Sequence, residues 1–144
     1  MSMLRAAKAP AAVAAPDTTV IAAIRTMEKA NVGAVVVLEG GKLKGMFSER
    51  DVMLRVVLAG KDPETTPVGE VMTSTVMTVT QDTEPSEAVK AMWENHIRHL
   101  PVINQDGTVE GVVEIRNLFH ESFDDLNDQL NTLESYISVD GFGG

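Results

Sequence analysis

The fold of this chain is decided by residues 45–52, Gly-Met-Phe-Ser-Glu-Arg-Asp-Val. Its first residues are apolar and its last begin a helical pattern, so the stretch predicts a buried strand that runs into a helix. Ser48 and Asp51 lie at the junction, at the spacing of a capping box. A degraded copy occupies residues 111–118, Gly-Val-Val-Glu-Ile-Arg-Asn-Leu. The chain therefore contains one structural unit twice.

The segments that precede these two stretches also repeat. Residues 17–30 and 82–95 each begin with Asp-Thr and continue with apolar residues at helical spacing. We expect Asp17 or Thr18 to cap the first helix, because their side-chain oxygens can accept its free N–H groups. Trp93 lies on the apolar stripe of the second helix and is predicted to be a core residue rather than a stacking platform.

Short apolar runs follow each helix, at residues 34–38 and 100–103. Both are rich in β-branched residues, which predicts buried strands. Tight turns at residues 39–42 and 105–107 contain the glycines that hairpins need, so return strands are expected at 43–47 and 109–113. The first return strand enters a helix at about residues 49–59. A short helical turn at 68–73 leads into a further strand predicted near 75–79.

Composition narrows the function classes. The net charge of −9 opposes generic binding to nucleic acid or anionic membrane. The absence of cysteine excludes thiolate catalysis and cysteine metal sites. Residues 1–15 faintly resemble a targeting peptide, but Lys8 and Pro10 interrupt the apolar part, so we expect a frayed or strand-forming terminus and a cytoplasmic protein.

The predicted organisation has six parts: an N-terminal arm at 1–12, repeat 1 at 13–60, a linker at 61–67, repeat 2 at 68–118, a helix at 119–138 and a disordered tail at 139–144. Apolar residues in the 119–138 segment alternate at spacings of four and three, from Phe119 to Ile137. Two interpretations stay open for this amphipathic helix. It packs back on its own domain, or it pairs with the same helix of a second copy.

The ordered set of motifs resembles the paired cystathionine-β-synthase-type (CBS) domains, called a Bateman module. The resemblance spans about residues 13–118 and rests on residues 16–20, 33–37, 45–51, 71–73 and 97–102. It implies an α+β fold of two β-α-β-β-α repeats, packed through their sheets about a pseudo-two-fold axis. It also implies a regulatory ligand sensor, usually dimeric, with adenine nucleotides such as AMP, ADP, ATP or NAD as ligands.

Ser48, Arg50 and Asp51 are the central candidates for a nucleotide site. Asp51 can accept hydrogen bonds from both hydroxyls of a ribose, and the adjoining helix start favours phosphate. Arg50 can form a fork-shaped phosphate contact. A capping box alone also explains Ser48 and Asp51, and the two roles are compatible.

The second copy is altered at the corresponding positions. Glu114 replaces Ser48 and Asn117 replaces Asp51. Glu114 would repel phosphate, and Asn117 would bind a ribose without charge assistance, so we expect one good site and one weakened site, with Arg116 as an alternative contact. The resemblance places two strand edges beside the ligands. These edges are Gly33, Ala34 and Val35 in repeat 1 and Arg98, His99 and Leu100 in repeat 2.

The sequence predicts no catalytic residue, no metal site and no required cofactor. No P-loop or nucleophile elbow is present, and His96 with His99 lacks a third clustered ligand. Three hypotheses follow: a nucleotide-binding regulatory module that senses energy or redox state, a constitutive dimeric scaffold with vestigial clefts, and a nucleotide hydrolase as the least favoured. The expected partners are an adenine nucleotide, a second copy of the chain and an unknown regulated protein.

Overall fold

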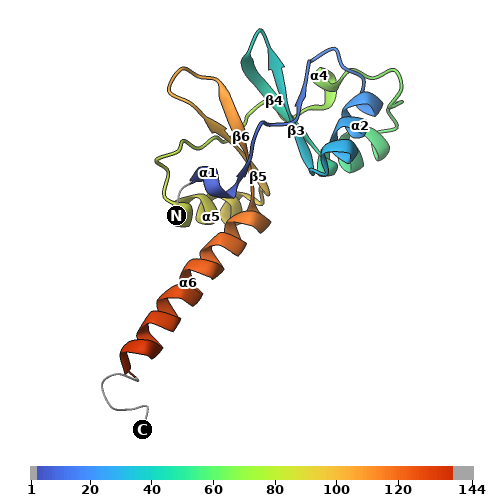
Figure 1. Ribbon diagram of the computed structural model, residues 1–144. Helices are drawn as coiled ribbons and strands as arrows, with labels where there is room; N and C mark the ends of the chain where they lie inside the picture. The colour runs from blue at the N-terminus through green and yellow to red at the C-terminus, as the bar shows by residue number, and fades with distance from the viewer. Residues whose placement is uncertain (1–2, 138–144) are drawn as a thin grey trace.

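Two three-stranded sheets, one from each repeat, form the centre of the computed structural model, which describes residues 3–137 (Figure 1). The expected α+β fold of two similar repeats is confirmed. The predicted tail at 139–144 lies outside the described residues. The elements are α1 (Met3–Ala6), β1 (Ala7–Lys8), β2 (Val13–Ala14), α2 (Val20–Ala30), β3 (Ala34–Glu39), β4 (Lys42–Ser48), α3 (Glu49–Asp51), the π-helix η1 (Val52–Val57), α4 (Val68–Val71), α5 (Pro85–Asn95), β5 (His99–Ile103), β6 (Val109–Glu114) and α6 (Ile115–Ile137).

The first sheet has the strand order β2-β3-β4, and the second has the order β1-β6-β5. The predicted hairpins are present as the antiparallel pairs β3–β4 and β5–β6. Their turns contain Gly40, Gly41 and Gly107 at positive φ, which glycine adopts at little cost. The matched residues Met27 and Met92 are both buried, one in each core.

The N-terminal segment joins the two repeats. Strand β1 pairs antiparallel with β6 of repeat 2, whereas β2 pairs parallel with β3 of repeat 1. Met3 is fully buried in the core of repeat 2. Residues 3–8 therefore complete the second repeat although they precede the first one in the chain.

A third apolar cluster lies between the sheets and contains Ala34, Val36, Met46 and Val112. Their neighbours on the same strands, such as Val35 and Val113, point into the core of their own repeat, because successive strand residues face opposite sides. Each sheet is thus covered on both faces, which explains the continuous apolar runs in the sequence. The expected packing of the repeats through their sheets is confirmed.

Three local predictions are wrong. The predicted strand at 75–79 is only a single bridge, Val79 with Val102, because the preceding residues line a cleft instead of pairing. The first long helix is capped by Thr19, whose hydroxyl accepts from the Ala22 N–H at 3.3 Å, whereas Thr18 bonds to Ala15. Trp93 is 72% exposed and does not belong to the core, since Ala88 and Met92 form the buried face of α5.

Helix α6 is continuous from Ile115 to Ile137 and extends away from the two repeats (Figure 1). Its first turns are anchored by Leu118, which is fully buried in the core of repeat 2. Beyond those turns the helix does not fold back. Within the described residues, no helix combines the length and apolar composition needed to cross a membrane.

Candidate functional site in the first cleft

A cleft of about 890 Å³ lies where the two repeats meet, and it contains the stretch that decides the fold. One wall comes from the end of β4 and the start of the following helix, and the other from the residues around the start of β5. The residues between α4 and α5 supply the rest. The lining includes Ser48, Glu49, Arg50, Asp51, Arg55, Thr73, Thr75, Val76, Met77, His96, Arg98 and His99.

Asp51 is the most constrained group in this cleft. It is only 7% exposed and forms the predicted capping box with Ser48. The Ser48 N–H donates to Asp51 Oδ2 at 3.0 Å, and the Asp51 N–H donates to Ser48 Oγ at 3.3 Å. The carboxylate is therefore fixed at the N-terminus of a helix, where the helix dipole favours negative charge.

Two further residues hold Asp51 from the opposite side. The Thr73 hydroxyl donates to Asp51 Oδ1 at 3.1 Å, and Arg55 Nε lies 3.5 Å from the same oxygen. Arg55 also donates from Nη1 to the Met72 carbonyl at 2.9 Å. Neither Thr73 nor Arg55 was expected at this site from the sequence. The signal for Arg55 was its helical spacing of four from Asp51, whereas Thr73 is 22 positions away and only the fold brings it near.

Gly45 explains why residues 72–73 can approach β4 so closely. Thr73 and Met46 exchange backbone hydrogen bonds of 2.8 and 2.9 Å. A Cβ on Gly45 would lie only 2.6 Å from both the Met72 sulfur and the Thr73 carbonyl oxygen. The glycine that opens the fold-deciding stretch is therefore needed to bring Thr73 to Asp51.

His99 lies beside the boundary between the repeats. Its Nε2 is 3.9 Å from Glu114 Oε1, and a Cβ on Gly33 would lie 2.9 Å from the same nitrogen and 3.2 Å from Glu49 Oε1. Burial lowers the pKa of His99 below its ordinary value of 6.5, Glu114 and Glu49 oppose this shift, and Arg98 adds to it. The imidazole is thus held between carboxylates from both repeats while its neutral form is favoured.

The predicted site residues do not form one group. Ser48, Arg50, Asp51, Arg98, His99 and Ala34 share the first cleft. Val35 and Leu100 are fully buried with their side chains in the two repeat cores, so only their backbone atoms remain available at the strand edges. Gly33 lies next to the His99 ring, and its carbonyl oxygen accepts a hydrogen bond from the Glu49 N–H at 3.0 Å.

The pseudo-symmetric second cleft has a volume of about 740 Å³ and different chemistry. Glu114 lines it in place of Ser48. Lys8 occupies the position equivalent to Thr73, because it pairs with Val112 as Thr73 pairs with Met46. Lys8 Nζ donates to the Asn31 carbonyl at 2.9 Å. Arg116 and Asn117 lie in the first turn of α6 but are not among the residues that line this cleft. The N-terminal segment approaches β6 as closely as residues 72–73 approach β4, because a Cβ on Gly111 would clash with the Lys8 carbonyl.

Two α+β repeats joined through their sheets, with a cleft on each side of the junction, define a tandem-repeat module as the structural class. The CBS domain family model matches residues 6–58 and 68–124. The chain therefore belongs to the CBS domain family and contains a pair of these domains.

Relatives and solved structures agree with this assignment. The chain is 35% identical to the mitochondrial CBS domain-containing protein CBSX3 of Arabidopsis thaliana over 126 residues, which are 84% of this chain and 61% of that protein. It is 36% identical over 107 residues to YhcV of Bacillus subtilis, covering 74% of this chain and 75% of that protein.

Two solved structures extend the comparison. A protein with CBS domains from Burkholderia ambifaria matches with a TM-score of 0.78 and 29% identity, covering 87% of this chain and 96% of that one. The CBS domain protein PAE2072 of Pyrobaculum aerophilum, complexed with AMP, matches with a TM-score of 0.73 and 26% identity, covering 81% and 89%.

Proposed function

We propose that the first cleft binds an adenine nucleotide and that the protein is a non-catalytic regulatory module that senses cellular energy or redox state. The observation that carries this proposal is the placement of Asp51, a buried carboxylate fixed by Ser48, Thr73 and Arg55 at the edge of a cleft large enough for a nucleotide. Its two oxygens suit the two hydroxyls of a ribose, and Thr73 and Arg55 can yield their contacts to a ligand.

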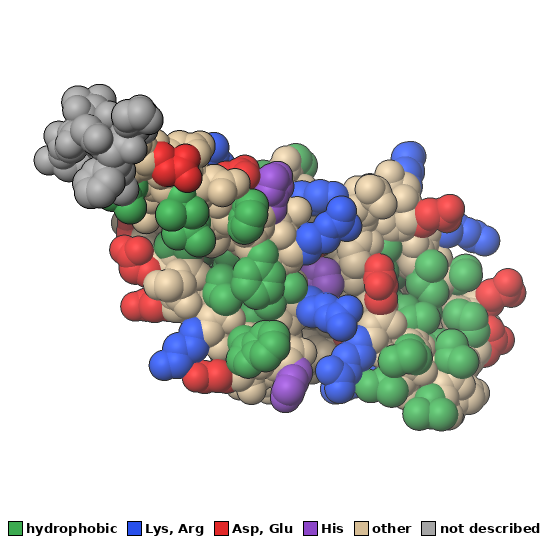
Figure 2. All heavy atoms as spheres, turned by 90° about the horizontal axis from the view of Figure 1, so that it is seen from below, with side chains coloured by type: hydrophobic (Ala, Val, Ile, Leu, Met, Phe, Trp, Pro, Cys, Tyr) green, Lys and Arg blue, Asp and Glu red, His purple; other side chains and the backbone are tan. Residues whose placement is uncertain are grey.

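The charges around Asp51 support the phosphate end of the same ligand. Arg50 and Arg98 come from different repeats, are both exposed, and line the same cleft. Figure 2 shows basic side chains gathered in the middle of one face, between hydrophobic groups. Arginine forks on two sides of a cleft favour a phosphate held between the repeats. AMP in the similar protein PAE2072 supports this choice of ligand class, which covers AMP, ADP, ATP and NAD.

A comparison of Asp51→Ala with Asn117→Ala tests the proposal. These positions are equivalent in the two repeats, so Asn117→Ala is the matched control. We expect Asp51→Ala to lose roughly 1.5–3 kcal/mol of nucleotide affinity, the value of a hydrogen bond to a charged group, while Asn117→Ala keeps the main binding event.

Calorimetry with AMP, ATP and NAD measures these affinities, and mass spectrometry of nucleotide released from the denatured protein identifies the natural ligand. Equal affinities of the wild type and Asp51→Ala would remove Asp51 from the site. A coupling free energy of about 1–3 kcal/mol between binding and the regulated state is enough for a switch.

A second candidate function is a constitutive dimeric scaffold. It is favoured by large apolar side chains that are exposed on both repeats. Met53, Val57 and Leu58 lie on η1 and directly after it, and Trp93 lies on α5, with exposures from 58% to 77%. Contiguous exposed apolar groups are typical of interaction surfaces. The purified protein is first tested for bound nucleotide, and its melting temperature is then measured with and without added nucleotide. If it carries none and no nucleotide raises its melting temperature, the scaffold is favoured over the sensor.

A further inference from the structure

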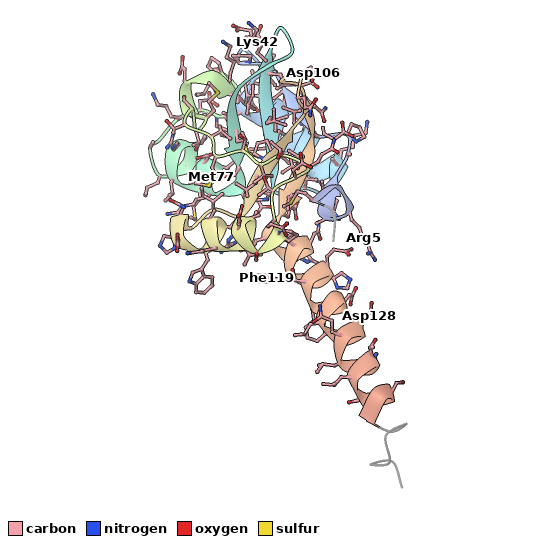
Figure 3. The ribbon with its side chains drawn as sticks, turned by 90° about the vertical axis from the view of Figure 1, so that its left-hand side faces the viewer. Arg5, Lys42, Met77, Asp106, Phe119 and Asp128 are labelled. Carbon is pink, nitrogen blue, oxygen red and sulfur yellow. The ribbon has the colours of Figure 1, made fainter. Side chains whose placement is uncertain are left out.

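Helix α6 presents an apolar stripe that no described residue covers. Five side chains at heptad spacing, each 47% to 62% exposed, form this stripe: Phe119, Phe123, Leu126, Leu130 and Leu133. The helix projects from the repeats for most of its 23 residues (Figures 1 and 3). A helix that is amphipathic and unsupported needs a partner for its apolar face.

The opposite face of α6 is the one that docks on its own chain. Glu121 pairs with Arg5 of α1 at 3.1 Å. In the heptad, Phe123 and Leu130 occupy the a positions and Leu126 and Leu133 the d positions, which places Glu121 at f, on the far side of the helix. Figure 3 labels Phe119 and Asp128, which are nine residues or about two and a half turns apart and therefore project from opposite sides.

The charge pattern identifies the occupant. Three acidic residues, Glu121, Asp124 and Asp128, occupy b or f positions, away from a paired helix. The flanking e positions hold His120, Asn127 and Glu134, and the g positions 122 and 129 hold Ser122 and Gln129. A basic partner helix would be matched by acidic residues along both flanks. A histidine near one end and a glutamate near the other instead complement a second copy of the same helix.

The same charges fix the direction of pairing. Four of the five acidic residues in the sequence of α6 lie in residues 121–128, and only Glu134 lies beyond them. A parallel pair would bring the two acidic halves side by side, whereas an antiparallel pair separates them. In the antiparallel register, Leu126 meets Leu130 of the second copy and Phe123 meets its Leu133. His120 then faces Glu134 of the second copy, and the helix dipoles oppose one another favourably.

We propose that α6 pairs with α6 of a second copy as an antiparallel two-helix coiled coil centred between Leu126 and Leu130. The pairing places the two repeat pairs at opposite ends of the helix pair, about 35 Å apart along a helix of this length. The pairing does not rest on the proposed nucleotide binding, because none of the residues that line the first cleft belongs to the stripe.

Leu130→Glu tests the contact, with Asn131→Glu as the matched control. Both add one negative charge at neighbouring positions of the same helix, but only residue 130 lies in the stripe. Because each pair loses two buried leucines, Leu130→Glu should raise the dissociation constant at least about 100-fold. The mass measured by sedimentation should then halve. Asn131→Glu should keep the wild-type mass. Equal masses for the wild type and Leu130→Glu overturn the proposal.

Cysteine cross-linking tests the direction, because the chain has no cysteine of its own. In the antiparallel pair, residue 127 meets its counterpart across the two-fold axis, so Asn127→Cys should form an intermolecular disulfide on mild oxidation. Leu126→Cys should cross-link much more slowly, since it faces residue 130. Rapid cross-linking of Leu126→Cys with none at Asn127→Cys indicates a parallel pair and overturns the proposal. The absence of cross-linking at both positions overturns it as well.

Discussion

His99 is the residue whose protonation the fold controls most directly. Burial lowers its pKa, so the folded protein binds a proton there less readily than the unfolded chain does. At pH values between the lowered pKa and the ordinary pKa of 6.5, His99 is protonated to a greater extent in the unfolded state than in the folded state. The free energy of unfolding therefore rises with pH in this range. The stability that neutral His99 contributes is lost as the pH falls through this window.

A His99→Gln variant should show a weaker dependence of stability on pH. Glutamine cannot titrate, so the decrease in the free energy of unfolding between about pH 7.5 and about pH 5.5 should be smaller than in the wild type. Urea unfolding at several pH values measures it. His96→Gln is the control, since His96 is exposed at the end of α5. A slope unchanged by His99→Gln, or changed as much by His96→Gln, would contradict the assignment.

The sequence predicts residue roles best where the interaction is local. The capping box of Ser48 and Asp51 follows from their spacing of three and is present as expected. Thr73 reaches Asp51 only because Gly45 lets a distant segment pack against β4, and a single sequence carries no sign of that approach. Trp93 was misplaced because helical spacing defines a stripe but not its edges, and Trp93 lies just outside the buried face.

Helices α2 and α5 both end in a left-handed residue that is not glycine. Asn31 and His96 are their C-cap residues, and both have φ of 54°, in the left-handed region. Both residues carry a Cβ, which makes this conformation sterically unfavourable. Asparagine tolerates it better than histidine does, because its short polar side chain can form local hydrogen bonds. The capping N–H groups still reach the last helical carbonyls, including that of Met92.

His96→Gly should therefore stabilise the protein by about 0.5–1 kcal/mol, because glycine adopts positive φ without a steric penalty. Asn31→Gly should give a smaller gain. Thermal unfolding checks both changes. Asn95→Gly, one residue earlier and still helical, should instead destabilise the protein by about 1 kcal/mol. A loss of stability in His96→Gly would show that the strain is relieved by contacts of the imidazole.

Helices and strands are predicted correctly where apolar residues recur at a regular spacing. The prediction is wrong where strand pairing depends on residues far away in the sequence. Helices α2 and α5 and both hairpins follow from spacing and turn glycines. Residues 75–79 have strand composition, yet they pair only at Val79 because the cleft occupies the neighbouring space. The heptad pattern predicted a helix from residue 119. The structure shows that α6 begins earlier, at Ile115, directly after β6.

The whole molecule is tied together by two features that the repeat pattern does not reveal. The N-terminal segment contributes β1 to one sheet and β2 to the other, and the cluster around Val36 and Val112 joins the sheets face to face. A unit of about 50 residues buries too little surface to be stable alone. The repeats should therefore unfold as one cooperative unit, even though each has its own core.

Phe47→Leu tests this cooperativity, because Phe47 is fully buried in the core of repeat 1 and lies outside the cluster between the sheets. We expect a loss of about 1–2 kcal/mol from the smaller side chain. If the molecule unfolds as a unit, the slowest-exchanging amides of β5 and β6 in repeat 2 lose the same free energy of protection, measured by hydrogen exchange. Trp93→Leu, which replaces an exposed aromatic side chain of α5 outside the core, should leave them unaltered. If protection is lost in β3 and β4 alone, the N-terminal segment and the sheet interface do not couple the two repeats. A nucleotide bound between the repeats could then act on each repeat separately.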